Sequence, residues 1–383
     1  MAPGPDCDTP HPTHPFTEQE RLSWLRLIRS RRVGPVTFHR LLAEHGTAQA
    51  ALAALPDVAR AAGVNDYAAC PAEVALHEMR AARAAGARMV CPGEAAYPEH
   101  LAGLPDAPPV LWLRGDVALL ARPMVALVGA RNASSLGIRM ARRLAGALGE
   151  AGFVVVSGLA RGIDGEAHSA ALGTGTVAVM AGGVDVIYPV ENGGLAARIA
   201  AEGALLSEQP MGTEPQARHF PLRNRIVSGL ARAVVVVEAA ARSGSLITAK
   251  EAADQGREVL AVPGHPFDAR AAGCNQLIRE GATLVRSAED VIEALGQVPA
   301  PAARAHAALP DGVLPGPVPA RRPLAEIAAL HRKILDRLSP SPVAEDQLIR
   351  DLAVPAHEVA PQLLTLELEG RVLRQPGGLI CRA

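Results

Sequence analysis

The sequence lacks the features that mark disulfide-stabilised, membrane-spanning and exported proteins. Its five cysteines are scattered along 383 residues without a Cys-x-x-Cys pair, which argues against a disulfide framework and a zinc site and favours a reduced, cytoplasmic location. No uninterrupted run of about 18 apolar residues occurs, so membrane insertion is not expected. Residues 1–16 have no apolar signal core, and we expect them to form a disordered tail.

Lysine and aromatic residues are also scarce. Lysine occurs only at Lys250 and Lys333, so nearly every basic residue is an arginine, and aromatic residues make up 3% of the chain. The formal net charge of −1 excludes a generally basic protein. Any nucleic-acid site must therefore be a local patch of arginines on a nearly neutral molecule.

Changes in composition divide the chain into three folded parts. Residues 17–85 begin with the capping box Thr17-Glu18-Gln19-Glu20 and predict a small helical module of the helix-hairpin-helix or SAM-like type. The turn Val33-Gly34-Pro35 contains a proline, which has no backbone N–H to donate to a phosphate. A packing module is therefore the alternative to a phosphate-binding hairpin. Residues 86–297 alternate between strands and helices, and residues 298–323 predict a linker rich in proline and alanine.

The last part, residues 324–383, predicts a winged-helix domain. Three helices near 324–338, 344–352 and 356–369 precede a hairpin that turns at Pro376-Gly377-Gly378. The third helix would be the one to enter a DNA groove, but it carries Glu358, Glu367 and Glu369 and neither lysine nor arginine. Because these carboxylates would repel phosphate, we predict a protein-interaction or packing role for this domain.

Residues 86–297 predict an α/β fold with a Rossmann-like, doubly wound, mostly parallel sheet. Several strands are nearly continuous apolar runs, as expected where helices cover both faces of a sheet. The predicted strands are Arg88–Val90, Val110–Leu113, Met124–Val128, Phe153–Val156, Thr176–Met180, Ala204–Ser207, Ala233–Val237, Glu258–Val262 and Thr283–Val285.

Small and basic residues follow the predicted strands. Gly129-Ala130-Arg131 comes directly after the strand at 124–128, and Ser157-Gly158 with Arg161 comes after the strand at 153–156. The carboxyl ends of parallel strands meet at one edge of a sheet, where ligands bind. The chain has neither GxxxxGK[ST] nor GxGxxG, which disfavours a P-loop ATPase and a nicotinamide cofactor.

Later loops bring more arginines and one aromatic residue to the same edge. Arg218, Phe220, Arg223 and Arg225 follow the strand at 204–207, and Arg242 follows the strand at 233–237. Several arginines along one edge suit a polyanion better than a single phosphate, and an aromatic ring among them can stack on an unpaired base, worth ~1–3 kcal/mol per base.

These residues also have structural interpretations. Arg223 and Arg225 can instead pair with Glu208 or Glu238, which would hold the sheet edge together. Phe220 can equally fill the core at the start of a helix.

Asp164, Glu166 and His168 resemble an acid–base or metal cluster. A carboxylate near the start of a helix is more often a cap, however, and no third ligand is evident, so structural roles are favoured. No metal and no cofactor are expected.

A set of motifs runs in order and register along roughly Pro98 to Leu295. It comprises VGAR at 128–131, SGLARGIDGEAH at 157–168, FPLRNRI at 220–226, RSGSLITA at 242–249, VPG at 262–264 and GCNQLI at 273–278. This combination resembles the DNA-processing protein A family (DprA, also called Smf). The flanking helical and winged-helix modules also occur in members of that family.

The resemblance implies a single-stranded DNA-binding protein of natural transformation that protects incoming strands and loads the RecA recombinase on them, as a homodimer without known catalysis. It puts the family's loop arginine on Arg131 and its aromatic residue on Phe220. A basic residue of some members falls near Ala217, where Arg218 is the candidate substitute. The family's dimer contact falls on Leu277, Ile278 and Leu284.

We therefore predict that the chain holds single strands through phosphate contacts and base stacking, largely without sequence preference. The predicted DNA-binding residues are Gly129, Arg131, Ser157, Gly158, Arg161, Arg218, Phe220, Arg223, Arg225 and Arg242. Two alternatives stay open. One is a Rossmann-like enzyme such as a nucleoside-monophosphate phosphoribohydrolase, for which Glu166 leaves room. The other is an interaction scaffold centred on the winged helix, in which case removing the residues after Val298 abolishes function but spares DNA binding.

Overall fold

The computed structural model describes residues 16–296 except 62 and 65, residues 324–338 and 343–352, and residues 354–355, 359, 362–363, 366–367, 371–375 and 379–382. The predicted linker at 298–323 lies outside the described residues, as does nearly all of the predicted tail. The exception is Phe16, which is buried with the Arg21 guanidinium 5.8 Å from its ring centroid. The predicted domain boundaries stay predictions. The chain divides into two compact units, Leu22–Ala72 with the residues from Ala303 onward, and the remainder, and each is described by itself.

In the described part of the chain, four helices precede the sheet: α1 (Glu18–Arg29), α2 (Pro35–His45), α3 (Ala48–Ala61) and α4 (Ala72–Ala84). The predicted capping box begins α1, because Thr17 N donates to Glu20 Oε2 at 2.8 Å and Glu20 N donates to Thr17 Oγ1 at 3.2 Å. Pro35 is the first residue of α2. A backbone N–H at this position would have no acceptor within the helix, so proline costs no hydrogen bond there. Trp24 of α1 packs on Phe38 of α2, with ring centroids 4.9 Å apart.

Nine strands form one sheet in the order β1-β2-β6-β5-β4-β3-β7-β8-β9. The pairs from β6 to β9 are all parallel, whereas β1 pairs antiparallel with β2, and β2 antiparallel with β6. The predicted Rossmann-like, mostly parallel sheet is thus confirmed. The strands are β1 (Arg88–Val90), β2 (Leu111–Gly115), β3 (Met124–Gly129), β4 (Val154–Ser157), β5 (Thr176–Val179), β6 (Ala204–Ser207), β7 (Ala233–Glu238), β8 (Glu258–Ala261) and β9 (Thr283–Leu284).

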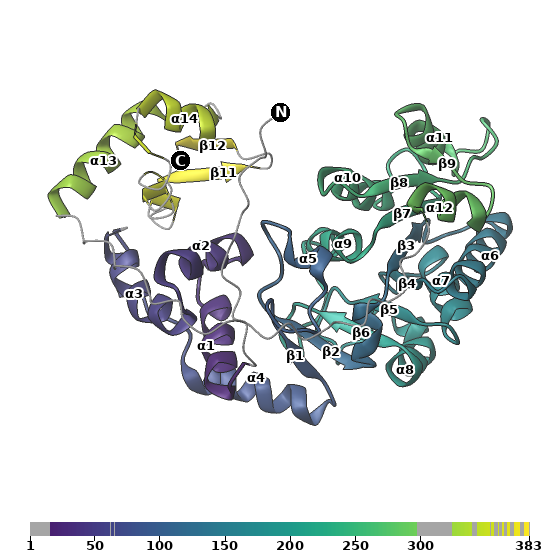
Figure 1. The fold of residues 1–383 in the computed structure, drawn as a ribbon, viewed down its shortest axis with the longest axis horizontal. Helices are drawn as coiled ribbons and strands as arrows, with labels where there is room; N and C mark the ends of the chain where they lie inside the picture. Colours follow the sequence, from purple (N-terminus) through teal and green to yellow (C-terminus); the bar gives the residue numbers. More distant parts are fainter. Residues whose placement is uncertain are drawn as a thin grey trace, which may run out of the picture. The chain divides into compact units, whose positions relative to one another are not determined.

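Alternate residues of each central strand face opposite helical layers. On β3, Met124 belongs to the core beneath α9 and α10, and Val125 belongs to the core beneath α6 and α7. Figure 1 shows these two helix pairs on opposite sides of the strands. Burial on both faces explains why the central strands are apolar at nearly every position. The helices between the strands and after the last strand of this sheet are α5 (Glu99–Ala102), α6 (Ser135–Glu150), α7 (Ile163–Ala171), α8 (Gly193–Glu202), α9 (His219–Leu230), α10 (Ser245–Asp254), α11 (Ala272–Arg279) and α12 (Ala288–Leu295), with short 3₁₀ turns η1 (Val117–Ala121) and η2 (Val190–Asn192).

The C-terminal residues form the predicted winged-helix arrangement. Helices α13 (Leu324–Arg337) and α14 (Glu345–Leu352) accompany a small sheet in which β12 (Leu379–Arg382) pairs antiparallel with β10 (Val343–Ala344) and β11 (Val372–Gln375). The third predicted helix, at 356–369, falls largely outside the described residues. None of the described helices is long and apolar enough to cross a bilayer.

Candidate functional site

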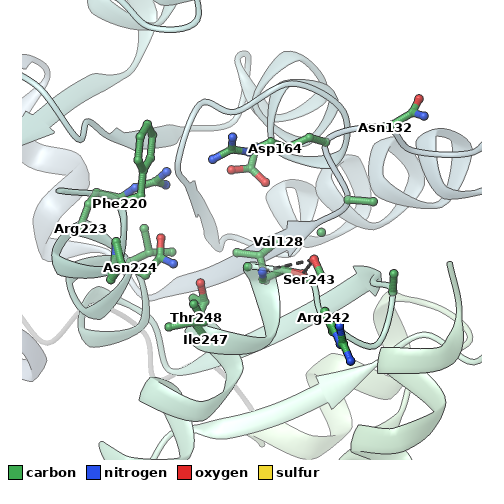
Figure 2. Close-up of a pocket in the computed structure, with 18 of the residues that line it drawn as sticks. Val128, Asn132, Asp164, Phe220, Arg223, Asn224, Arg242, Ser243, Ile247 and Thr248 are labelled. Atoms are coloured by element: carbon green, nitrogen blue, oxygen red, sulfur yellow. Dashed lines mark hydrogen bonds between the residues drawn. The ribbon is translucent and has the colours of Figure 1, made fainter. Parts of the chain in front are cut away.

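A cavity of about 630 Å³ opens beyond the carboxyl ends of β3 and β7. Val128, at the end of β3, lines its base, and the loop after β3, the start of α9 and the loop after β7 line its walls. Figure 2 shows Phe220 on one side of the cavity and Arg242 on the other. The predicted convergence of strand-end loops therefore takes place, and it encloses a volume of the size usual for small-ligand sites.

Arg131 and Phe220 meet at the rim of the cavity. The guanidinium of Arg131 lies over the ring of Phe220, 5.2 Å from its centroid, which is a cation–π distance. The ring of Tyr188, from the loop after β5, lies 5.8 Å from that of Phe220 and is tilted by 57°. Phe220 is therefore a half-buried rim residue and not the core plug that the sequence left as an alternative.

The loop that carries Arg131 is tied to its neighbours. Glu238, the last residue of β7, accepts hydrogen bonds from the backbone N and the hydroxyl of Ser134, the N-cap of α6. Ala130 N donates to Glu238 O at 2.7 Å, and Ala130 O accepts from Ile163 N at 3.2 Å. These bonds hold the backbone of the loop while the Arg131 side chain stays exposed.

Arg223 is a buried cation in the wall of the cavity. It is 7% exposed, and no described residue accepts a hydrogen bond from its Nε atom. Gly158 makes room for it, because a Cβ at residue 158 would lie 1.1 Å from Arg223 Nη1. Burial lowers the pKa of Arg223, and the nearby Asp164 carboxylate opposes that shift. A charge kept in this position with little solvent is suited to an anion that enters the cavity.

The Asp164 carboxylate stabilises the loop after β4, beside Arg223. It accepts from Gly158 N at 3.1 Å and from Ala160 N at 3.4 Å, so it closes the loop after β4. Burial raises the pKa of Asp164, whereas the positive charge of Arg223 lowers it. Asp164 therefore has the favoured structural role, as a counter-charge of Arg223 and an acceptor for loop amides, although it does not cap α7.

Half of the predicted DNA-binding residues line the cavity. These are Gly129, Arg131, Phe220, Arg223 and Arg242. The other predicted residues do not line it. Arg161 is exposed and approaches Glu191 at 3.7 Å, and Arg218 is exposed just before α9.

Ser157 and Gly158 do not line the cavity, and the backbone amide of Gly158 does not face a ligand as expected. Ser157 is fully buried, and its hydroxyl donates to Leu127 O at 2.6 Å. The backbone N–H of Gly158 already donates a hydrogen bond to the Asp164 carboxylate. A buried donor that already has a partner inside the fold is unavailable to a ligand.

Arg225 follows the alternative interpretation. It is 6% exposed, and its guanidinium contacts Glu208 at 2.5 Å and Asp106 at 3.3 Å. Glu238, the other carboxylate considered, is bonded instead to Ser134. Arg225 therefore holds the sheet edge together, and the expected direct phosphate contact is replaced by a structural role.

Several polar residues of the cavity had not been singled out from the sequence. Asn224 lies between the two arginines of the Arg-Asn-Arg motif, so the motif itself carried that signal. Arg270 lies on the loop between β8 and α11, where no sequence pattern pointed to it. Of the remaining polar lining residues, Ser243, Ser245 and Thr248 lie in the motif at 242–249, and Asn132 lies in none of the motifs.

The carboxylates and the histidine of α7 do not form a reactive cluster. Glu166 points to Arg142, with Oε2 2.5 Å from Nε, and His168 is buried, with Nδ1 2.7 Å from Thr176 Oγ1. The Thr176 hydroxyl donates to Val155 O at 2.8 Å, so the histidine Nδ1 must carry the proton in their contact. Among the described residues, no group of three or more potential metal ligands occurs.

His168 makes the fold sensitive to acid. Burial, and then the positive charge of Arg223, lower its pKa to about 3. The unfolded chain binds a proton near pH 6.5 and the folded chain does not, so this site destabilises the fold progressively as pH falls from about 6.5 towards 3, by at most ~1.4 kcal/mol per pH unit. Urea unfolding at stepped pH should show a flatter acid slope for His168→Gln than for the wild type. An unchanged slope, or the same flattening in the exposed His77→Gln, would contradict this role.

Three family models match successive parts of the chain. The DprA-like N-terminal HHH domain matches residues 18–81, DNA recombination-mediator protein A matches residues 88–296, and the DprA winged helix domain matches residues 318–378. The chain is 37% identical to Protein Smf of Synechocystis over 76% of this chain and 79% of that protein. It is 47% identical to the DNA processing protein DprA of Bacillus subtilis over 52% of this chain and 68% of that protein.

Two solved structures share this fold. The X-ray structure of DprA from Streptococcus pneumoniae superposes with a TM-score of 0.53 at 38% identity, over 62% of this chain and 86% of that chain. DNA processing protein A from Helicobacter pylori, described for its single-stranded DNA binding mode, superposes with a TM-score of 0.51 at 30% identity, over 55% of this chain and 95% of that chain.

Proposed function

The chain belongs to the DNA recombination-mediator protein A family, DprA, and from this premise we propose that it binds single-stranded DNA in the cavity beyond β3 and β7. One observation carries the proposal: exposed Arg131 and Arg242 flank the buried Arg223 and the half-buried ring of Phe220 in a single cavity. Guanidinium groups attract phosphates whatever the base sequence, and an aromatic ring stacks on any base. This combination suits a strand that is bound without sequence preference, and no catalytic step is part of the proposal.

The predicted arginines of the cavity fall into a buried group, Arg223, and an exposed group, Arg131 and Arg242. Arg223 is already desolvated and has Asp164 as its counter-charge, so little ordering is needed when a phosphate arrives. Arg131 and Arg242 are exposed and adapt to the path of the strand. In this proposal Arg131 exchanges its place over the Phe220 ring for a phosphate contact and so frees the ring for a base.

The remaining predicted residues act around the cavity. We propose that the exposed Arg161 and Arg218 extend the set of arginines that contact phosphates beyond the cavity. Ser157, Gly158 and Arg225 act indirectly, because they shape the loops from behind.

We further propose that the protein protects incoming single strands in natural transformation and loads the RecA recombinase on them in the cytoplasm. The family membership and the single-strand binding described for the Helicobacter pylori relative support this role. We propose that it works as a homodimer through Leu277, Ile278 and Leu284. Leu284 is 41% exposed on β9, the last strand of the sheet, and exposed apolar edge strands are common places for contact between chains.

A salt series tests the DNA site. Affinity for an oligonucleotide of mixed sequence should fall steeply with salt, by about 0.7 in log–log slope for each phosphate contacted. Arg131→Ala should weaken binding roughly tenfold or more and reduce that slope by about one contact, as measured by fluorescence anisotropy. Arg198→Ala, which removes an exposed arginine paired with Glu202 on α8, is the matched control. Equal affinities for these two variants would refute the assignment of Arg131.

The enzymatic alternative gains no support from the described residues. Glu166, which had kept it open, is bonded to Arg142 and does not line the cavity. Asp164 lines the cavity but is committed to the loop amides and to Arg223.

A further inference from the structure

The phenylalanines of this chain are distributed unevenly between core and surface. Of the five in the sequence, Phe16, Phe38 and Phe153 are buried. The other two are Phe220, at the rim of the cavity, and Phe267, whose side chain is 93% exposed. An aromatic ring left almost wholly in water gives up its burial energy, which marks it as a candidate contact for a partner molecule.

Phe267 lies on a loop that is held in shape without it. The Asn275 side chain accepts from Gly264 N at 3.1 Å and donates to Gly264 O at 3.0 Å, so it clasps the start of the loop. Asp268 N donates to His265 O at 2.9 Å, which forms a turn. The His265 ring lies 5.6 Å from the Phe267 ring. The loop therefore presents a pair of rings to solvent as a formed feature.

The same loop contributes to the cavity. Arg270 lines the cavity, and its backbone N and Nε both donate to Asp268 Oδ1, at 3.0 and 3.3 Å. Asp268 and Arg270 thus offset each other's charge, so the two rings are the features of this loop that face a ligand, and the exposed Arg242 supplies a cation in the same cavity. A nearby cation and a π surface are what a single strand requires.

The sheet order puts this ring pair on the far side of the cavity from Phe220. Tyr188, which contacts Phe220, follows β5, and Phe267 follows β8. The order β5-β4-β3-β7-β8 places the ends of β5 and β8, from which the two loops start, four strand intervals apart, or roughly 20 Å at the usual strand spacing. At the spacing of a stacked strand, that distance takes roughly 6 nucleotides.

We propose that Phe267, with His265, forms a second base-stacking position, so that a bound strand runs from the Tyr188–Phe220 pair across the arginines of the cavity to the His265–Phe267 pair. The proposal rests on the proposed single-strand function and extends it. It commits to a nucleic-acid base as the occupant, because the exposed Arg242 lines the cavity on the way and the acidic Asp268 is offset by Arg270.

Oligonucleotide length separates the two positions. With oligo(dT) of about 4 to about 16 nucleotides, the range of known single-strand sites, Phe220→Ala should weaken binding at every length. Phe267→Ala should leave the shortest oligonucleotides unaffected and weaken binding of the longer ones by roughly 5- to 160-fold. Val74→Ala, which shortens an exposed apolar side chain of α4, is the control and should change neither. Absence of wild-type binding at every length would refute the proposed function itself. A normal wild type with an unaffected Phe267→Ala would refute only the second position.

A fluorescent variant gives an independent measurement. Trp24 and Trp112 are buried and provide a constant background, so Phe267→Trp adds one exposed reporter. Its fluorescence should be quenched by long oligo(dT), and binding should stay close to that of the wild type because tryptophan also stacks. If Phe267→Ala instead dissociates a dimer in sedimentation velocity while long oligonucleotides still bind normally, the ring is a protein contact and the proposal is wrong.

Discussion

Replacing Asp164 with alanine should lower the free energy of unfolding by about 3–5 kcal/mol, the usual cost of leaving a buried charge without its counter-charge. The change removes the acceptor for Gly158 N and Ala160 N and leaves the buried Arg223 guanidinium without its compensating carboxylate. Urea unfolding followed by circular dichroism measures the loss. Single-strand affinity should fall as well, because the loop that positions Arg223 is no longer closed.

Two further variants identify the cause. Glu166→Ala, on the same helix, removes only a partly exposed contact with Arg142 and should cost less than about 1 kcal/mol. The double variant Asp164→Ala/Arg223→Met removes both charges and should be more stable than Asp164→Ala alone. If the double variant is instead less stable by the sum of the single effects, Asp164 and Arg223 are energetically independent and the account of the buried pair is wrong.

Replacing Gly162 with alanine should cost at least about 3 kcal/mol, because strain and a backbone collision combine. Gly162 has φ +74°, and a Cβ there would lie 2.2 Å from Ala130 O and 2.7 Å from Arg131 O. Both contacts are with backbone of the loop that carries Arg131, so the loop must move. Thermal unfolding should report the lost stability, and anisotropy should report weaker single-strand binding.

Gly256→Ala provides the matched comparison. Gly256 also has a positive φ, of +68°, but a Cβ there meets nothing within 4 Å. It should therefore cost only the backbone strain, ~1–3 kcal/mol, and leave DNA affinity unchanged. If the two variants lose equal stability and both keep full affinity, the contact between the loops after β3 and β4 does not matter for the site.

The sheet could be predicted closely from the sequence, because a strand buried on both faces is apolar at nearly every position. The prediction at 204–207 coincides with β6, and that at 233–237 differs from β7 only by Glu238 at its end. The direction of β2 could not be predicted in this way. A short apolar run has the same pattern whether it pairs parallel or antiparallel.

The candidate site could be predicted in part. Arg131, Phe220 and Arg242 follow directly from the rule that strand-end loops meet at one edge, and they line the cavity. Arg225 carries the same signal in the sequence, yet it is buried against Asp106, which lies 119 residues away along the chain. Arg270 carried no signal and lines the cavity all the same.

By itself, the sequence determined the family, the mostly parallel sheet and the edge at which the loops gather, since each of these depends on local patterns of apolar, small and basic residues. The tertiary structure decided which polar groups remain available to a ligand. The Ser157 hydroxyl and the Gly158 backbone N–H donate hydrogen bonds to acceptors inside the fold. Arg223 is buried near Asp164, its counter-charge. Such outcomes depend on which distant donor and acceptor come together, and that pairing is settled only when the loops pack.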